Sequence, residues 1–346
     1  MNAMNEATHA APKMKRPADT KLVISARLRF SLWRVPEGLV NHIRNRWPEM
    51  KVIHLPNHDL LDAELPDTDI FVGYLLRPEQ LRMAARLAWL HSISAGVSQL
   101  MYPELRDSGI AVTNASGVHA PPTAEHVVGL VIAMSRDFLG AMRYQARRLW
   151  AQQEIWDGAA RPREIGGQVA LLVGFGAVGR AIAERLGALG MRVHAVTHSG
   201  RTDSGLAERV FAVSQLDAAL PEADFVILAA PETAETRHIM GARQIAAMKA
   251  SAFLINVARG SLIDETALVS ALERRAIAGA ALDVAAQEPL PSESPLWPLE
   301  NVFITPHLSG VSERVWPRET ELLLDNLERW FAAQPLRNRV DLARGY

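Results

Sequence analysis

The chain has 346 residues, 49% of them hydrophobic, and a formal net charge of −1 at pH 7. This length suffices for two domains with sizeable cores, and the balanced charge argues against a general nucleic-acid binder. There is no cysteine, which excludes disulfides, thiolate nucleophiles and cysteine-ligated zinc and fits a reducing compartment. No uninterrupted apolar run reaches the roughly 18–20 residues of a membrane span. We therefore expect a cytoplasmic protein without a membrane or nucleic-acid partner.

Residues 1–20 lack the apolar core of a signal peptide and are expected to form a loose, disordered N-terminal extension. A cloning remnant and a weak transit peptide are both compatible with this stretch. Strand-like runs then alternate with segments of helical spacing, the strands being expected at 21–28, 50–55, 68–74, up to residue 94, and 109–116. Such alternation indicates a parallel α/β sheet.

Residues 123–150 have the pattern of one long helix, with Thr123 as a plausible N-cap after Pro121 and Pro122. The first half of this segment is apolar nearly all round. A helix of that kind is buried, either within the chain or against a second subunit.

A second α/β series starts at Gln168. Six strands are expected, at 168–176, 191–196, 224–230, 252–258, 277–284 and 302–306. Six parallel strands are what a complete dinucleotide-binding fold requires. The last strong pattern, at 319–333, predicts an amphipathic terminal helix.

Gly174, Gly176 and Gly179 fit the pattern G-x-G-x-x-G. A tight strand-to-helix turn without a ligand would show the same pattern. Here a buried strand precedes the turn and a helix ended by Gly190 follows it, which is the context that phosphate binding needs. Missing side chains let the backbone approach a pyrophosphate, and the N-terminus of the helix favours its negative charge.

The glycine turn assigns the second series to a dinucleotide-binding Rossmann domain over residues 118–310. Residues 21–117 plus 311–346 are expected to form a substrate (catalytic) domain. The predicted fold class is α/β, with two Rossmann-like domains, doubly wound parallel sheets and a cleft between them.

The end of the strand at 191–196 selects the coenzyme. An acidic residue there would bind the ribose hydroxyls of NAD, but the next residue is the uncharged Thr197. His198, Ser199 and Arg201 follow, and all can donate hydrogen bonds to a 2′-phosphate. An ordinary solvated turn is the alternative, and Asp203 nearby weakens the argument. The pattern favours NADP(H) and leaves NAD(H) possible.

Three polar residues follow apolar runs in the second series: Arg259, Glu288 and His307. A cation, a carboxylate and an imidazole at strand exits are the groups needed to hold a 2-keto acid and to protonate its carbonyl oxygen. Together with the glycine turn they indicate hydride transfer to a small acid, although none of the features suffices alone.

Several ordered motifs resemble the D-isomer-specific 2-hydroxyacid dehydrogenases, the family that includes glyoxylate/hydroxypyruvate reductases. They are LLVGFGAVGRAIAERLGALGM, PETAETRHIM, FLINVARGSLIDETALVSAL, ALDVAAQEPLP, SPLWPLENVFITPHLSG and the ending NRVDLARGY. The resemblance covers nearly all of the chain after residue 20. It implies a homodimer, since relatives are commonly dimers and the apolar helix from Thr123 fits that.

The resemblance also implies roles for single residues. Arg259 would grip the carboxylate and keto oxygen of the substrate, and His307 would act as general acid/base with Glu288 as its partner. Asp283 would face the nicotinamide carboxamide, or be structural instead. The backbone N–H groups of Ala95, Gly96 and Val97 would meet the substrate carboxylate. The full set of expected coenzyme-binding residues is Gly174, Phe175, Gly176, Ala177, Val178, Gly179, Thr197, His198, Ser199, Arg201, Ala230, Pro231, Val257, Ala258, Asp283 and His307.

Two alternatives share parts of this pattern. An enzyme resembling formate dehydrogenase would pair its histidine with glutamine, so Glu288 counts against that reading. A dinucleotide-sensing corepressor of the same fold would keep the arginine, glutamate and histidine, and the sequence leaves such a non-catalytic binding protein open. No cluster of metal ligands is apparent among the 11 histidines.

Overall fold

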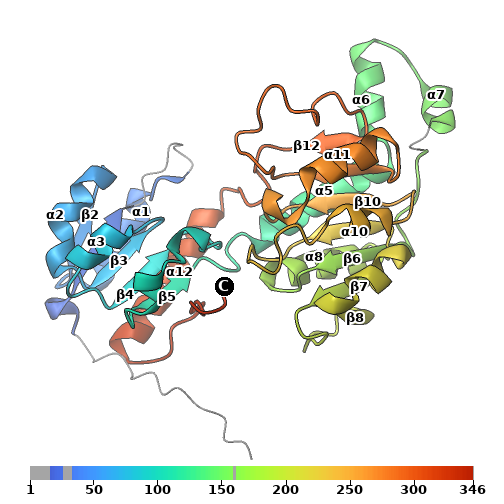
Figure 1. The fold of residues 1–346 in the computed structure, drawn as a ribbon. Helices are drawn as coiled ribbons and strands as arrows, with labels where there is room; N and C mark the ends of the chain where they lie inside the picture. Colours follow the sequence, from blue (N-terminus) through green and yellow to red (C-terminus); the bar gives the residue numbers. More distant parts are fainter. Residues whose placement is uncertain (1–15, 26–32, 159–160, 346) are drawn as a thin grey trace, which may run out of the picture. The chain divides into compact units, whose positions relative to one another are not determined.

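The computed structural model describes residues 16–25, 33–158 and 161–345. They divide into two compact units, one formed by residues up to Val118 together with those from Glu313, and the other by His119–Ser312. Both units are α/β structures whose sheets are entirely parallel (Figure 1). The predicted α/β fold class with two parallel sheets is confirmed.

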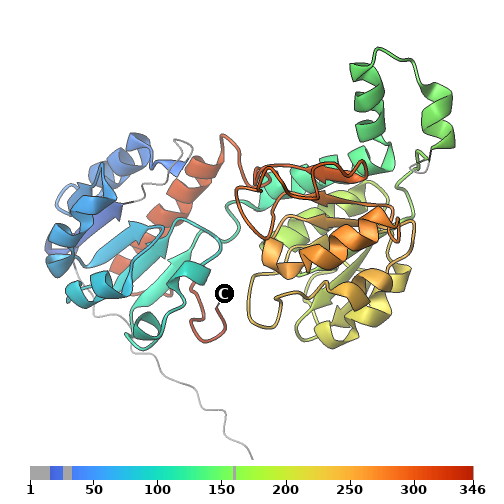
Figure 2. The ribbon, with the colours of Figure 1, turned by 45° about the horizontal axis from the view of Figure 1, so that its top comes forward.

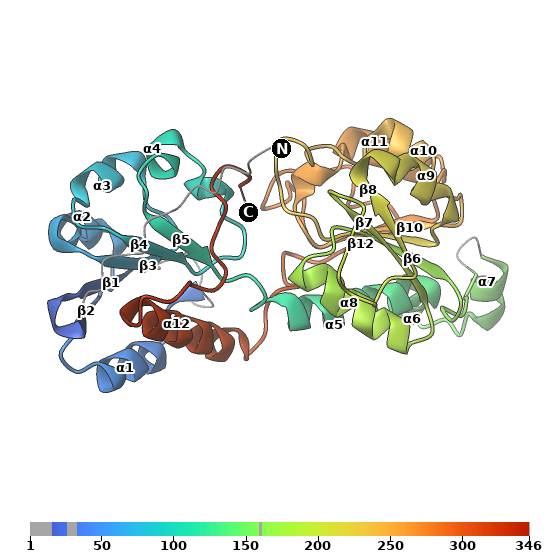
Figure 3. The same cartoon turned by 90° about the horizontal axis from the view of Figure 1, so that it is seen from below.

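The first unit has a sheet of strand order β2-β1-β3-β4-β5. Its strands are β1 Lys21–Ser25, β2 Lys51–His54, β3 Ile70–Gly73, β4 Trp89–Ser92 and β5 Ala111–Asn114. Its helices are α1 Glu37–Arg46, α2 Leu61–Glu64, α3 Pro78–Met83, α4 Pro103–Arg106 and α12 Val315–Phe331. Figure 3 shows α1 and α12 on one face of this sheet and α2, α3 and α4 on the other. The predicted terminal helix thus covers one face of the sheet together with α1.

The second unit has a seven-stranded sheet of order β12-β11-β10-β9-β6-β7-β8. Its strands are β6 Val169–Val173, β7 Arg192–Thr197, β8 Arg209–Ala212, β9 Phe225–Leu228, β10 Phe253–Asn256, β11 Gly279–Leu282 and β12 Val302–Ile304. Its helices are α5 Ala120–Ser135, α6 Phe138–Ala146, α7 Gln152–Asp157, α8 Ala177–Ala188, α9 Leu216–Ala219, α10 Ala242–Ala246 and α11 Glu265–Glu273. Helices α5 and α8 cover one face, and α9 to α11 cover the other (Figure 2).

The strand order of the second unit reverses beside β6. From β6 the chain runs outward to β7 and β8, and it then returns to β9 on the other side of β6. In open parallel sheets a ligand binds beyond the carboxyl ends of the strands at such a switch point. The turn after β6 and the exits of β9 to β12 share this edge because all the strands run in one direction.

Two helix predictions were wrong. The segment from Thr123 to Trp150 is not one helix: α5 ends at Ser135, and α6 begins after Asp137, which has a left-handed φ of 49° and accepts a hydrogen bond from the Gly140 N–H at 3.1 Å. Thr123 is not the N-cap, because α5 begins at Ala120 and includes both prolines in its first turn. Proline is tolerated there, since the first N–H groups of a helix have no partner within it.

Two smaller differences concern the strand count and the N-terminal extension. The strand β8 was missed, because RVFA is short and lies at the sheet edge, half exposed. The predicted extension ends earlier than residue 20: Pro17–Asp19 form a turn of 3-10 helix, and Thr20 is only 2% exposed. Residues 1–15 of that prediction, and 26–28 of the predicted first strand, lie outside the described residues.

Candidate active site

The glycine turn between β6 and α8 assigns a different task to each of its glycines. Gly174 has a φ of +99°, and a Cβ there would lie 2.5 Å from the Ala230 N atom. A Cβ on Gly179 would lie 2.3 Å from the carbonyl oxygen of Gly174. Gly176 differs, because a Cβ would meet no atom within 4 Å. The turn therefore needs the first and third glycines for its own packing, whereas the second leaves open space beside the N-terminus of α8, where a pyrophosphate fits.

The residues after β7 form an ordered turn with an exposed outer side. The Thr197 hydroxyl accepts a hydrogen bond from the Arg201 N–H at 3.1 Å, which closes the turn. The side chains of His198, Ser199 and Arg201 are exposed. Asp203 lies 4.0 Å from the Arg180 guanidinium, so its charge has a cation beside it. The residues expected to choose the coenzyme are thus gathered on one turn, next to the glycine turn.

The segment after β10 holds Arg259. The Asn256 side chain accepts a hydrogen bond from the Ala258 N–H at 3.0 Å and donates one to the Arg259 carbonyl oxygen at 2.8 Å, which fixes the bend. A Cβ on Gly260 would lie 2.0 Å from the backbone of Ala285. The bend carrying the guanidinium therefore packs directly against the loop that leads to Glu288.

His307 and Glu288 form a hydrogen-bonded pair, with Nδ1 of the ring 2.7 Å from Oε2 of the carboxylate. Burial by itself would raise the pKa of the Glu288 carboxyl, but the His307 hydrogen bond and charge, the Ala285 N–H and the charge of Arg259 together lower it. His307 and Arg259 thus both act electrostatically on the Glu288 carboxylate. The Glu288 carboxylate is ionised at neutral pH, so it accepts a hydrogen bond from the Nδ1–H group of His307. The Nε2 atom of His307 is therefore left to exchange a proton.

Asp283 holds the backbone around His307. It is 1% exposed, and its carboxylate accepts hydrogen bonds from the Thr305 hydroxyl at 2.6 Å, the Leu308 N–H at 2.8 Å and the Ser309 N–H at 2.9 Å. Its own carbonyl oxygen accepts the His307 N–H at 2.8 Å. His307 adopts a left-handed φ of 54°, which costs a non-glycine residue roughly 1–3 kcal/mol. The structural role weighed for Asp283 is therefore present, and its contact with the nicotinamide stays a prediction.

The remaining predicted residues lie in three places. Phe175, Ala177 and Val178 belong to the glycine turn, and Ala230, Pro231, Val257 and Ala258 follow β9 and β10 at the same sheet edge. The predicted carboxylate-binding loop follows β4 in the other unit. There the Ala95 carbonyl oxygen accepts a hydrogen bond from the Asn114 amide at 2.8 Å, Gly96 is partly exposed and Val97 is buried.

Sequence reasoning assigned no role to several supporting residues. Asn256 and Thr305 were present in the quoted motifs, but nothing in their spacing showed which groups they hold. Glu232 accepts a hydrogen bond from the Ser261 hydroxyl at 2.7 Å and so ties the loop after β9 to the bend that carries Arg259. Its only signal in the sequence was a carboxylate beside Pro231.

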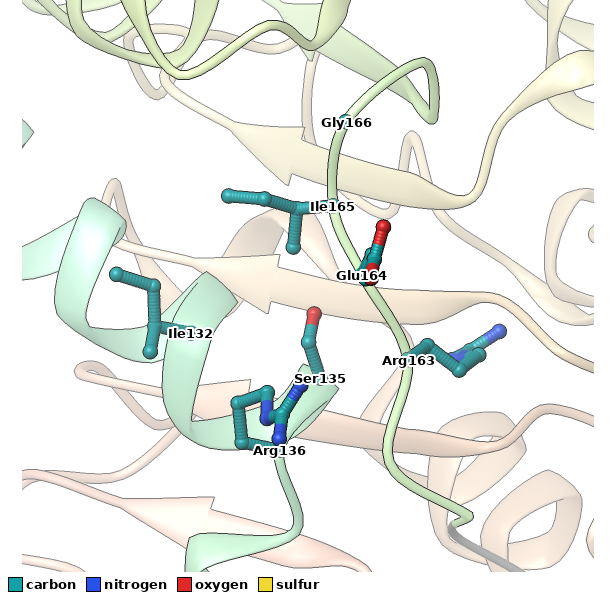
Figure 4. Close-up of a pocket in the computed structure, with 7 residues that line it drawn as sticks. All are labelled: Ile132, Ser135, Arg136, Arg163, Glu164, Ile165 and Gly166. Atoms are coloured by element: carbon teal, nitrogen blue, oxygen red, sulfur yellow. The ribbon is translucent and has the colours of Figure 1, made fainter.

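A shallow pocket of about 300 Å³ lies elsewhere in the second unit, between the end of α5 and residues 163–166 (Figure 4). It is lined by Ile132, Ser135, Arg136, Arg163, Glu164, Ile165 and Gly166. None of the predicted site residues is among them, so the pocket has no part in the site described above. Within the described ranges, no group of three or more histidine, aspartate or glutamate side chains could hold a metal ion. In the same ranges, no helix is both long and apolar enough to cross a membrane.

The fold and the site define a class of protein: an α/β protein with a dinucleotide turn, an arginine and a His–Glu pair along one edge of a parallel sheet. Residues 128–309 match the family model described as D-isomer specific 2-hydroxyacid dehydrogenase, NAD binding domain. The chain belongs to this family, as the sequence resemblance predicted, and is an NAD(P)-dependent 2-hydroxyacid dehydrogenase.

Named relatives agree with this membership. Glyoxylate reductase of Korarchaeum cryptofilum is 33% identical over 79% of this chain and 82% of its own length. Glycerate dehydrogenase of Methylorubrum extorquens is 32% identical over 75% of this chain and 81% of its own. Among solved structures, a D-isomer specific 2-hydroxyacid dehydrogenase from Xanthobacter autotrophicus Py2, in complex with NADPH and MES, superposes with a TM-score of 0.81 at 26% identity, covering 94% of this chain and 99% of that one.

Proposed function

We propose that the protein interconverts a small 2-keto acid, such as glyoxylate or hydroxypyruvate, and the corresponding D-2-hydroxy acid. When bound, the reduced nicotinamide supplies the hydride that the reaction needs. The observation that carries the proposal is the His307–Glu288 hydrogen bond of 2.7 Å, with the charge of Arg259 acting on the same carboxylate. The names of the glyoxylate reductase and glycerate dehydrogenase relatives support the substrate class.

Each of the three residues has a defined task in this proposal. The Arg259 guanidinium binds the substrate carboxylate and keto oxygen, for which its permanent charge and paired donors are suited. His307 delivers a proton from Nε2 to the carbonyl oxygen and removes it in the reverse direction. The Glu288 carboxylate orients the ring through Nδ1 and stabilises the charged imidazolium.

The two units divide these tasks. We propose that His119–Ser312 binds the coenzyme, with Gly176 offering the open backbone for the pyrophosphate, and that the other unit contributes substrate contacts through the backbone of Ala95, Gly96 and Val97. The cytoplasmic location also stays a prediction.

NADP(H) is the coenzyme that we favour. The turn after β7 has no carboxylate at Thr197, and the exposed Arg201 offers a cation to a 2′-phosphate. The solved relative from Xanthobacter autotrophicus Py2 contains NADPH. The double substitution Thr197→Asp with Arg201→Ala should shift preference toward NADH by about 10–100-fold, the value of one lost charge-assisted hydrogen bond. An unchanged ratio of kcat/KM for NADPH and NADH would contradict this assignment.

The decisive test is a turnover screen of the purified protein. Glyoxylate, hydroxypyruvate, pyruvate and longer 2-keto acids are each offered with NADPH and with NADH, and D- and L-glycerate are compared in the oxidative direction. We expect coenzyme oxidation with at least one small keto acid and a preference for the D-enantiomer. Tight coenzyme binding without turnover of any acid would instead identify the non-catalytic, dinucleotide-sensing protein.

We further propose that the protein is a homodimer. Helices α6 and α7 project from the sheet-containing body of their unit (Figure 1), and this arm carries large apolar side chains in solvent. They are Phe138, Met142, Leu149, Trp150 and Trp156, with Trp150 as much as 95% exposed. Several large exposed apolar side chains on one segment are typical of a protein interface.

A further inference from the structure

The backbone that carries His307 is held from the side of α5 by a residue outside the quoted motifs. His126 lies in the first half of α5, and its Nε2 atom is 3.1 Å from the Thr305 hydroxyl oxygen. The same nitrogen is 3.7 Å from Oδ1 of Asp283. The imidazole therefore contacts the pair of residues that fixes residues 307–309.

The donors and acceptors of the hydrogen bonds between His126, Thr305 and Asp283 can be assigned from their chemistry. Thr305 has one hydroxyl proton, and it points to Oδ1 of Asp283, an ionised acceptor 2.6 Å away. The Thr305 oxygen can then only accept from His126, so Nε2 must carry a hydrogen. Burial lowers the pKa of His126, although the Asp283 charge acts to raise it. At neutral pH the ring is accordingly the neutral tautomer with its proton on Nε2.

We propose that His126 is a positioning residue for the reaction, acting through Thr305 and Asp283 on His307. By donating to Thr305 it holds the hydroxyl in the orientation that bonds to Asp283. Asp283 in turn fixes the Leu308 and Ser309 N–H groups and the left-handed backbone of His307. The ring of His307 is thereby kept at the distance at which Glu288 can bond to Nδ1. This inference rests on the proposed role of His307.

Paired substitutions separate the hydrogen bond from packing. His126→Phe keeps a ring of similar size without the donor, whereas His126→Gln keeps an N–H near the position of Nε2. Thr305→Val removes the hydroxyl with the shape retained, and Thr305→Ser keeps it. Glu125→Gln changes the exposed neighbour of His126 on the same helix and is the matched control.

We expect His126→Phe and Thr305→Val each to lower kcat about tenfold, a fraction of the roughly 10²–10⁴-fold that general acid catalysis contributes. The KM for the coenzyme should change less than about twofold, and the pH profile of kcat/KM should shift because the ring of His307 is less well held. Glutamine at 126 and serine at 305 should restore most of the rate, and Glu125→Gln should match the wild type.

The double variant His126→Phe/Thr305→Val tests whether the two side chains act as one chain. Its kcat should be no lower than that of the slower single variant. The reason is that the His126–Thr305 bond positions His307 only through the Thr305–Asp283 bond, so loss of either breaks the same chain. A loss equal to the product of the two single losses would overturn the proposal. So would single variants with wild-type kcat, or a His126→Gln variant as impaired as His126→Phe.

A measurement without turnover distinguishes failure of this inference from failure of the proposed function. Nitrogen-15 NMR of the histidine rings should show the Nε2–H tautomer for His126 and a shifted His307 Nδ1 signal in His126→Phe. A His307 Nδ1 signal that is the same in His126→Phe as in the wild type would contradict the positioning role, whether or not the protein reduces a keto acid. If the wild type reduces no keto acid but the His307 signal still responds, the proposed function fails and the structural coupling stands.

Discussion

At the scale of single residues, the site separates groups that exchange protons or bind anions from groups that only shape the backbone. His307 is exposed, Arg259 is partly exposed, and both carry the proposed chemistry. Gly174, Gly179 and Asp283 instead make contacts within the protein that fix the backbone. Substitutions in the two groups should therefore have different kinetic and thermodynamic signatures.

Removing the imidazole or the guanidinium should affect different kinetic constants. His307→Ala should chiefly lower kcat, by roughly 10²–10⁴-fold, because the proton donor is lost. Arg259→Ala should chiefly raise KM for the keto acid, because the carboxylate loses its charged partner. Steady-state kinetics with both substrates varied measures the two effects, with Arg274→Ala, at an exposed arginine after α11, as control. Near-wild-type kinetics in either site variant would remove that residue from the mechanism.

Substitutions of the glycines in the turn after β6 should likewise separate an effect on stability from an effect on coenzyme binding. Gly179→Ala places a methyl group against the Gly174 carbonyl oxygen and should destabilise the protein by about 1–3 kcal/mol. Gly176→Ala meets no protein atom, so the midpoint of thermal unfolding should stay near that of the wild type. Its methyl group would instead occupy the space proposed for the pyrophosphate, and the coenzyme Kd should rise at least about tenfold. Calorimetry and coenzyme titration test the pair; an unstable Gly176→Ala or an unaffected Kd contradicts the assignment.

At the scale of elements, the site depends on how the ends of β10, β11 and β12 are joined. The parallel pairing of β11 with β12 places Leu282 opposite Ile304, so Asp283 and Thr305 leave the sheet side by side. One buried carboxylate can then organise the whole segment that follows β12.

Stability in acid should report on this carboxylate. Burial acts to raise the pKa of Asp283, but the hydrogen bonds from Ser309, Thr305 and Leu308 lower it overall. A lowered folded-state pKa contributes stability that is fully present above the unfolded value of about 3.9 and is lost as pH falls through the folded value. Asp283→Asn should cost about 2–3 kcal/mol at pH 7, because an amide N–H₂ faces N–H donors.

Urea unfolding of wild type and Asp283→Asn from neutral to acid pH measures this contribution. The free energy of unfolding of the wild type should exceed that of Asp283→Asn by the full amount at pH 7. This difference should become smaller below about pH 4. A difference that is constant with pH would show that the carboxylate is not the stabilising group.

Sequence patterns located most elements but not all their limits. Alternation of apolar runs with helical spacing located β1 to β7 and β9 to β12 wherever the residues are described, because burial on both faces of a parallel sheet requires such runs. The break between α5 and α6 was not predicted. Aspartate favours the N-cap position, but the apolar spacing continues across Arg136 and Asp137. Only the backbone conformation of Asp137 shows that one helix ends and the next begins there.

At the scale of the whole molecule, the apolar arm formed by α6 and α7 has no evident function in a monomer. Trp150 is almost fully exposed, and Met142 and Trp156 are more than half exposed. Burial of such side chains between two copies would stabilise a dimer by roughly 25 cal/mol per Å² of apolar surface, before the entropy cost of association.

Replacing Met142 and Trp150 with serine should weaken the dimer. We expect light scattering after size exclusion to show a dimer for the wild type and a shift toward monomer for the double variant at micromolar concentration. Leu189→Ser, at an exposed leucine after α8, is the matched control and should not alter the mass. A monomeric wild type, or a double variant that stays dimeric, would refute the role of the arm.

The sequence by itself determined the fold class, the family, the glycine turn and the residues expected to carry the chemistry. Those signals are local: strand and helix periodicities, glycines at set spacing, and short motifs. Only the tertiary structure decided that Asp283 organises residues 305–309 and that His126 supports it. His126 and Thr305 are 179 residues apart in the chain. Their contact depends on how α5 packs over β10 and β11, a geometry that no local pattern contains.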